Sequence, residues 1–363
     1  MKKFIYSFLM IALCGTVFTS CENEDPEEPV IDPVLVSQGL FVLNEGSYYS
    51  GINGSLSYLD YQSNSIVNGF FEAANQRSLG GTPNDMVEVL GRLYICCTDE
   101  NRVEIAEATN GKSVTFVEVP QPRHICTSTF GVYVSSYDGT VYYISYEGKL
   151  LGQSKQVGAC LEGIAADEHY VYVCNAYNPD YTYNTNVVKL DAKTLEKVGD
   201  ITVACNPTDI KFCLDRLYVL STGNYADVQS QIQSIGADDK VKYECDATLM
   251  AVDDIDVYAI NSVTDWTTYE TKTEYFKINS RTGERSAIIS DADARDIFSP
   301  CGIAVDHGHQ CFFISSYSPG ASGYADYSGN GYIMQFDMDG KFIKRYEAGV
   351  GPTTMIPYGV WSF

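Results

Sequence analysis

A repeated strand pattern constrains this chain more than any other feature of its sequence. A short run of β-branched and aromatic residues, with an aromatic residue at its third position, occurs seven times at spacings of 39 to 55 residues. A period of this length, with connections of variable length, is typical of the blades of a propeller. The seven aromatic residues are Phe41, Tyr94, Tyr133, Tyr172, Tyr218, Tyr258 and Phe313.

Each copy is followed by a second strand-like stretch, and six copies are preceded by a short one such as TPNDMVEV. The first copy lacks a preceding strand, but the last nine residues, MIPYGVWSF, have the same character. The ring closes without a free sheet edge when this C-terminal stretch becomes the innermost strand of the blade formed by residues 38–77. The sequence therefore predicts an all-β fold, a seven-bladed β-propeller spanning residues 38–363.

The N-terminus indicates export and anchoring. Lys2 and Lys3 precede an apolar run over residues 4–14, which predicts a secretory signal at 1–20 that is too short to span a membrane. The small residues before Cys21 resemble the lipobox of bacterial lipoproteins, in which the cysteine is lipidated. The acidic run after it makes residues 21–37 a solvated tether and resembles the signal that routes lipoproteins of gut Bacteroidetes to the cell surface. An ordinary linker is the alternative for this run.

Charge and cysteine content narrow the range of ligands and folds. After removal of the signal, 22 basic residues face 47 acidic ones, a net charge of −25, which argues against nucleic acid as a ligand. Of the twelve cysteines, ten lie in the repeats, mostly within apolar strands and without a CxxC pair. Small buried hydrophobic residues are the favoured interpretation. One or two disulfides, such as Cys160 with Cys205, remain open.

The connections from second to third strand all reach the same face of a propeller, and five of them are long. They span residues 44–53, 175–186, 221–230, 261–272 and 315–331. Long loops in compact domains are typical of functional sites, and these carry tyrosine or tryptophan among Asn, Ser and Gly, the composition of a recognition surface. The alternative is that the rings pack against neighbouring loops. The candidate binding residues are Tyr48, Tyr49, Tyr137, Tyr177, Asn178, Tyr181, Tyr183, Asn224, Tyr225, Trp266, Tyr269, Tyr317, Tyr324 and Tyr327.

Catalytic signatures are weak. His124 beside Arg123, at the entry to an innermost strand, forms the one pair with a catalytic character, and we count both as ligand-binding candidates. The chain has no GxSxG, HExxH or glycine-rich phosphate loop, and DADARD at 291–296 lacks the spacing of a calcium loop. His307 and His309 fall in a turn on the face away from the long loops. We therefore predict no catalytic residue, no metal site and no cofactor.

With its repeats, lipobox-like signal and acidic run, the chain resembles a family of Bacteroidetes surface lipoproteins built on a YncE-like seven-bladed propeller. The resemblance covers residues 38–363 and rests on the repeated (L/V)(Y/F)(V/I) strands and on NEG, NP and GI turns. The opening stretch GLFVLNEGSYYSGINGSLSYLD and the aromatic loops are most similar to members that bind cobalamin and cap the TonB-dependent vitamin B12 transporter. This resemblance implies a corrinoid as ligand rather than catalytic cofactor, a barrel partner, and lipid anchoring at the outer membrane, facing the cell exterior.

Three other functions suit the same residues. Aromatic rings with Asn and Asp also fit a surface glycan-binding or adhesion module. The scaffold supports lactonases and lyases, for which turnover would depend on His124 or Arg123. A docking surface for the transporter alone, with no small ligand, is the third.

Overall fold

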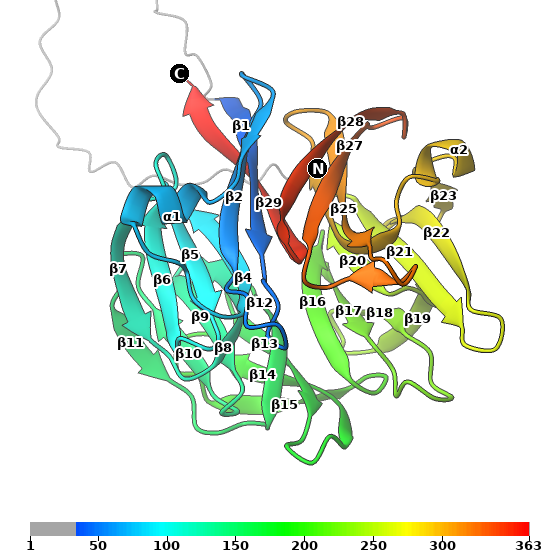
Figure 1. Cartoon of the computed structure of the whole chain (residues 1–363). Helices are drawn as coiled ribbons and strands as arrows, with labels where there is room; N and C mark the ends of the chain where they lie inside the picture. The colour runs from blue at the N-terminus through cyan, green and yellow to red at the C-terminus, as the bar shows by residue number, and fades with distance from the viewer. Residues whose placement is uncertain (1–33, 363) are drawn as a thin grey trace, which may run out of the picture.

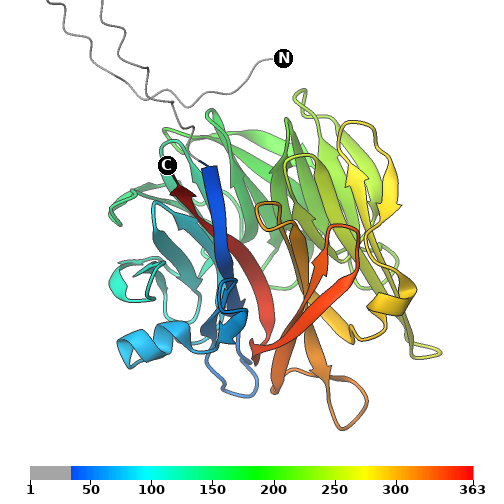
Figure 2. The same cartoon turned by 90° about the horizontal axis from the view of Figure 1, so that it is seen from above.

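A computed structural model of the chain describes residues 34–362. Seven antiparallel sheets stand around a common axis, and Figure 1 shows them arranged in a ring with the innermost strands towards its centre. Figure 2 shows the same sheets after a 90° turn. Six of the sheets have four strands, and the short strand β26 adds a fifth to the remaining one. The predicted seven-bladed β-propeller is confirmed.

We number the blades in chain order, beginning with the sheet that contains β4 and ending with the composite sheet. From the innermost strand outward the strands are, for blade 1, β4 (Pro83–Val89), β5 (Arg92–Cys97), β6 (Arg102–Glu107) and β7 (Ser113–Glu118); for blade 2, β8 (Pro122–Ser128), β9 (Gly131–Ser136), β10 (Val141–Ile144) and β11 (Leu150–Gln153); for blade 3, β12 (Cys160–Ala166), β13 (Tyr170–Tyr177), β14 (Tyr183–Asp191) and β15 (Lys197–Thr202).

The remaining blades follow the same order. They are, for blade 4, β16 (Pro207–Cys213), β17 (Arg216–Ser221), β18 (Gln231–Ile235) and β19 (Val241–Asp246); for blade 5, β20 (Leu249–Val252), β21 (Asp256–Asp265), β22 (Glu270–Asn279) and β23 (Arg285–Ala287); for blade 6, β24 (Ser299–Asp306), β25 (Cys311–Pro319), β27 (Asn330–Asp337) and β28 (Phe342–Val350), with β26 (Ala325–Asp326) beside β25; and for blade 7, β29 (Pro352–Ser362), β1 (Val34–Asn44), β2 (Ser55–Asp60) and β3 (Ser65–Val67).

The ring closes as the sequence predicts. Strand β29 pairs antiparallel with β1 from Val34 opposite Ser362 to Asn44 opposite Pro352, and it contacts β24 and β4 on either side. Both described ends of the chain therefore leave the ring on one face, and the connection after Asn44 lies on the other. Strand β1 begins at Val34, earlier than the expected start of the propeller at residue 38.

The core is divided among the interfaces between neighbouring blades. Within residues 34–362, seven hydrophobic clusters fill the seven interfaces, and each contains one of the seven repeat aromatics. Tyr94, for example, packs with Val132 and Tyr142 of blade 2, and Phe313 packs with Leu40 of blade 7. All seven aromatics are at most 7% exposed. The aromatic residue therefore recurs in the sequence because each blade buries one ring at the same position against the next blade.

Two short helices complete the described part: α1 (Phe70–Asn75), whose Phe71 is buried between blades 7 and 1, and α2 (Asp291–Ala294). No helix among the described residues is long and apolar enough to cross a membrane. The ten cysteines of the propeller are free thiols in this structure, Cys160 and Cys205 included. The expected signal and Cys21 lie outside the described residues.

Three of the five expected long loops are partly strand, so the prediction was wrong there. In the loop 315–331, the end of β25, all of β26 and the start of β27 are strand. Strands β21 and β22 continue to a turn at 266–269, and β13 and β14 take up both ends of 175–186. Cross-strand pairs between polar β-branched side chains, such as Thr264 with Thr271 at 2.8 Å between their hydroxyls, hold the longer hairpin. The hairpins carry their aromatic residues beyond the end of the blade.

Candidate functional site

The face that carries the second-to-third strand connections, here called the loop face, presents many aromatic rings to solvent. Tyr49 is 98% exposed and Trp266 is 75% exposed. The candidate rings that are exposed are Tyr48, Tyr49, Tyr181, Tyr183, Tyr225, Trp266, Tyr269, Tyr324 and Tyr327. Tyr137, Tyr177 and Tyr317 are half-buried. Exposed rings gathered on one face are typical of an interaction surface.

Some of these rings also contact one another, as the packing alternative expects. Tyr177 and Tyr181 stack with ring centres 6.0 Å apart, Tyr183 lies 6.1 Å from Tyr225, and Tyr317 meets Tyr327 edge-on at 4.7 Å. These pairs join neighbouring hairpins or the two sides of one loop. They leave much of each exposed ring accessible, so packing accounts for only part of the aromatic surface.

Three of the loop-face tyrosines have an unfavourable backbone conformation. Tyr181, Tyr225 and Tyr269 have φ values of 63°, 56° and 61°, in the left-handed region that favours glycine or asparagine. Such a conformation costs a bulky residue of order 1–3 kcal/mol, and it is concentrated at functional sites in proteins. All three side chains are exposed, so burial of the ring in the core does not offset this cost.

The candidate asparagines hold the loops in place. Asn178 donates to Thr182 Oγ1 at 3.0 Å, and Asn224 donates to Asp227 at 2.7 Å while accepting from two backbone N–H groups. Their amides are therefore occupied within their own loops, and they position Tyr181 and Tyr225.

Between blades 4 and 5 the loop face is hollowed to a volume of about 450 Å³. Residues of the 222–230 loop form one side, with Tyr225 among them, and residues 261–266 form the other and end at Trp266. We call this site the hollow. Asn261 contributes a buried side-chain oxygen that has no hydrogen-bond partner among the described residues. Asp246 is the one carboxylate of the lining described here, and the lining contains no lysine, arginine or histidine.

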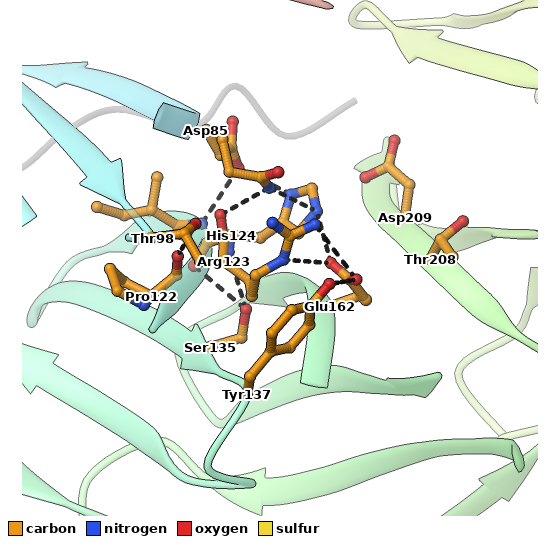
Figure 3. A network of polar contacts seen from close by, with 12 residues as sticks. Asp85, Thr98, Pro122, Arg123, His124, Ser135, Tyr137, Glu162, Thr208 and Asp209 are labelled. Atoms are coloured by element: carbon orange, nitrogen blue, oxygen red, sulfur yellow. Dashed lines mark hydrogen bonds and ion pairs between the residues drawn. The ribbon is translucent and has the colours of Figure 1, made fainter. Parts of the chain in front are cut away.

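Arg123 and His124 lie away from the exposed rings, at the central channel (Figure 3). His124 is held between two carboxylates: its Nδ1 lies 3.1 Å from Asp85 Oδ2, and its Nε2 lies 3.3 Å from Glu162 Oε2. The Arg123 guanidinium contacts Glu162 at 3.1 and 3.3 Å. Tyr137 donates to the same carboxylate at 2.6 Å, and its ring lies under Arg123. These five residues come from blades 1, 2 and 3, and we call them the channel network.

The channel network fixes the charge of its members. Burial opposes charging of His124, but hydrogen bonds to Asp85 and Glu162 outweigh it and raise the pKa of the imidazole to about 9. Burial likewise opposes ionisation of Glu162, while Arg123 and His124 lower the pKa of that carboxyl to about 2. The network is therefore two cations and two carboxylates at neutral pH, and its hydrogen-bonding groups are largely used internally.

The channel and the hollow are adjacent. A cavity of about 320 Å³ at the channel is lined by Arg123 and Glu162 on one side and by Leu249 on another. Thr222 and Thr248 line both this cavity and the hollow. The tyrosine chain connects them to the rest of the loop face, since Tyr181 stacks on Tyr177 and Tyr177 meets Tyr137 edge-on at 5.9 Å. A broad ligand could therefore contact the hollow, the channel mouth and the rings at once.

Sequence reasoning missed Asp85 and Glu162. The aligned innermost strands contained the information needed to find them. Asp85, His124, Gly163 and Asp209 share one position of the repeat, and the residue before each of them shares the neighbouring position. Residues at these two positions line the channel, where Asp209 stands across from the network (Figure 3). Comparing the repeats column by column would have brought together all members of the channel network except Tyr137, which follows β9.

The remaining histidines lie away from the loop face. His307 contacts Asp253 at 2.7 Å and His309 stacks on Tyr61 with ring centres 3.9 Å apart, in the turn between β24 and β25 on the opposite face. No group of three or more possible metal ligands is found within residues 34–362.

Comparison with known proteins shows the fold alone. No family model matches the chain, and no curated protein sequence matches it. Among solved structures, a hypothetical selenium-binding protein from Sulfolobus tokodaii is similar over 90% of this chain and 94% of its own, with a TM-score of 0.64 and 10% identity. The hydrazine synthase of Kuenenia stuttgartiensis matches over 75% of this chain and 88% of its own, with a TM-score of 0.60 and 14% identity. Apo AztD from Citrobacter koseri matches over 91% of this chain and 100% of its own, with a TM-score of 0.55 and 12% identity.

Proposed function

We propose that this protein is a surface-anchored lipoprotein that captures cobalamin or a related corrinoid on its loop face and passes it to an outer-membrane TonB-dependent transporter. The observation that carries the binding role is the set of exposed tyrosines held in left-handed backbone positions. Tyr181, Tyr225 and Tyr269 keep large rings where glycine would be less costly, and the rings are directed to solvent. A contact with a ligand outside the folded chain would offset this cost.

The chemistry of a corrinoid fits the loop face. A corrinoid is a broad, flat ring rimmed with amide side chains, and it exceeds the hollow in size. The adjoining hollow and channel mouth, with exposed rings around them, offer apolar contacts beside neutral polar groups. Each aromatic contact adds about 0.5–1.5 kcal/mol beyond area burial, so several loops acting together support tight binding.

The anchoring and the partner rest on the family resemblance. A lipidated Cys21 would hold the chain at the outer membrane through residues 22–33, and the strongly acidic propeller would favour a basic partner surface. The proposal needs no cofactor, metal or catalytic residue, because cobalamin is the cargo.

The direct test is calorimetry of residues 22–363 with cyanocobalamin, with co-elution of the coloured vitamin through a sizing column as a check. Tight one-to-one binding is the expected result. Absence of binding at tens of micromolar would overturn the corrinoid assignment.

A matched pair of variants tests the role of the rings. Tyr225→Gly and Leu90→Gly both relieve a left-handed backbone position at an exposed residue, but Leu90 lies in a turn on the opposite face, with φ 53°. Both variants should be as stable as the parent chain or slightly more so, and only Tyr225→Gly should weaken cobalamin binding. Equal affinities for the two variants would remove the observation on which the proposal rests.

A glycan is the second candidate ligand. Aromatic rings beside neutral hydrogen-bonding groups, without a basic residue in the described lining of the hollow, are also what sugar recognition needs. Retardation of the propeller in affinity gels that contain neutral glycans, together with no cobalamin binding, would favour this assignment.

A further inference from the structure

The geometry points to the hollow as a subsite for a neutral ligand group that donates a hydrogen bond to the Asn261 side-chain oxygen. The same subsite excludes an anionic group. Under the proposed function, on which this inference rests, the neutral group is one of the primary amides at the rim of the corrinoid. The inference assigns a role to Asn261, a residue that the sequence did not single out.

The first support is the unpaired oxygen. Asn261 lies on β21 where the strand leaves the blade, and its Oδ1 is buried without a partner among the described residues. A buried carbonyl oxygen without a hydrogen bond costs free energy, so such atoms are normally satisfied by water or by a ligand. Asn261 is one of the residues that line the hollow, so a donor group of a ligand bound there is a candidate partner for this oxygen.

The second support is that two neighbouring hydroxyl groups are already in use. Thr248 donates to the backbone oxygen of Ile260 at 3.0 Å, and Ser262 shares a hydrogen bond with Thr273 at 2.9 Å. Among these groups, Asn261 is the one that offers a free buried acceptor. Because Oδ1 can only accept, a hydrogen bond to this atom requires the ligand to be the donor.

The third support is charge. Asp246 accepts from Tyr243 at 3.1 Å and adds a negative charge to the lining, and no basic residue of the described lining opposes it. An anionic group placed in the hollow would be repelled by Asp246 and would find no counter-ion there. Tyr225 and Trp266 on either side would hold the apolar part of the ligand.

The test compares cyanocobalamin with its monocarboxylate derivatives, in which one peripheral amide is hydrolysed to an acid, by calorimetry. For the parent chain, at least one derivative should bind at least tenfold more weakly than cyanocobalamin. Asn261→Ala should weaken cyanocobalamin binding about 3- to 10-fold, the effect of one neutral hydrogen bond. Asn110→Ala, in an exposed turn on the opposite face, should leave affinity unchanged. Asp246→Asn should restore part of the lost affinity for the acid derivative.

A second measurement separates this inference from the proposed function. The chain has two tryptophans, so a Trp361→Phe variant leaves Trp266, at the hollow, as the sole tryptophan, which can be excited selectively over the tyrosines. If the affinity for cobalamin does not change with the Asn261 and Asp246 substitutions or with the charge of the derivative, the hollow assignment is overturned and the proposed function stands. Failure to bind cobalamin, with Trp266 emission responding to neutral but not acidic oligosaccharides in an Asn261-dependent way, would overturn the corrinoid and keep the hollow. No response to either class of probe would overturn both.

Discussion

Glu162 is the carboxylate on which the channel network depends, and Glu162→Gln should destabilise the propeller. The substitution keeps the size of the side chain but removes the charge that compensates Arg123 and His124. The Glu162 side chain is 7% exposed, so solvent cannot replace it. Removing one partner of a buried charge pair costs about 3–5 kcal/mol. Asp85 and Glu162 together raise the pKa of His124 to about 9, so loss of Glu162 removes part of the stabilisation of the charged imidazole and all of the carboxylate contact to Arg123.

The expected change in melting temperature follows from the size of the domain. An unfolding entropy of about 2.1 cal/mol/K per residue over roughly 330 residues gives about 0.7 kcal/mol/K, so the loss corresponds to a fall of roughly 4–7 °C. Thermal unfolding followed by circular dichroism at pH 6 measures it. The control is Glu168→Gln, the same substitution at an exposed turn position. A melting temperature for Glu162→Gln within 1 °C of both the parent chain and the control would refute the reasoning.

Three further predictions concern pH, packing and the loop face. Because the pKa of His124 is raised, the charged imidazole stabilises the fold fully below pH 6.5, and this contribution is lost as the pH rises through about 9. The denaturant concentration at the unfolding midpoint should therefore fall over this pH range in the parent chain and fall less in His124→Gln. Gly163→Ala should cost about 1–3 kcal/mol in urea unfolding, because its Cβ would lie 2.6 Å from a backbone atom of the next blade, whereas Gly152→Ala, with open space around it, should cost much less. Combining Tyr181→Ala with Trp266→Ala should weaken cobalamin binding roughly 5- to 150-fold at about 0.5–1.5 kcal/mol per ring; a large loss of melting temperature with unchanged affinity would instead show that the rings stabilise the fold.

The sequence predicted the ring and its closure because the same physical requirement recurs in every blade. Each interface between blades must bury one large ring, so residues such as Tyr94 and Phe313 stand at matching positions and reveal the period. The closing strand could be found for the same reason: the first repeat lacks an innermost strand, and an unassigned strand of the same character stands at the C-terminus.

The site was harder to predict because its parts come from different blades. Asp85, His124 and Glu162 follow one another at intervals of about 39 residues in the sequence, and they meet only when three blades stand around the channel. The left-handed backbone at Tyr225 depends on how its loop folds, and residue propensity would place Asn or Gly there. Whether the side-chain oxygen of Asn261 finds a hydrogen-bond partner depends on which residues pack beside β21 in the folded chain.

The pairing of β1 with β29 has a consequence for the time course of synthesis. Roughly 300 residues separate Asn44 from Pro352, and at about 5–20 residues per second the inner edge of β1 waits roughly 15–60 s for its partner. During that interval β1 offers an unpaired strand to any other chain nearby. A chaperone that shields this edge, or export before the ring can close, would protect the nascent protein from pairing with a second copy of itself.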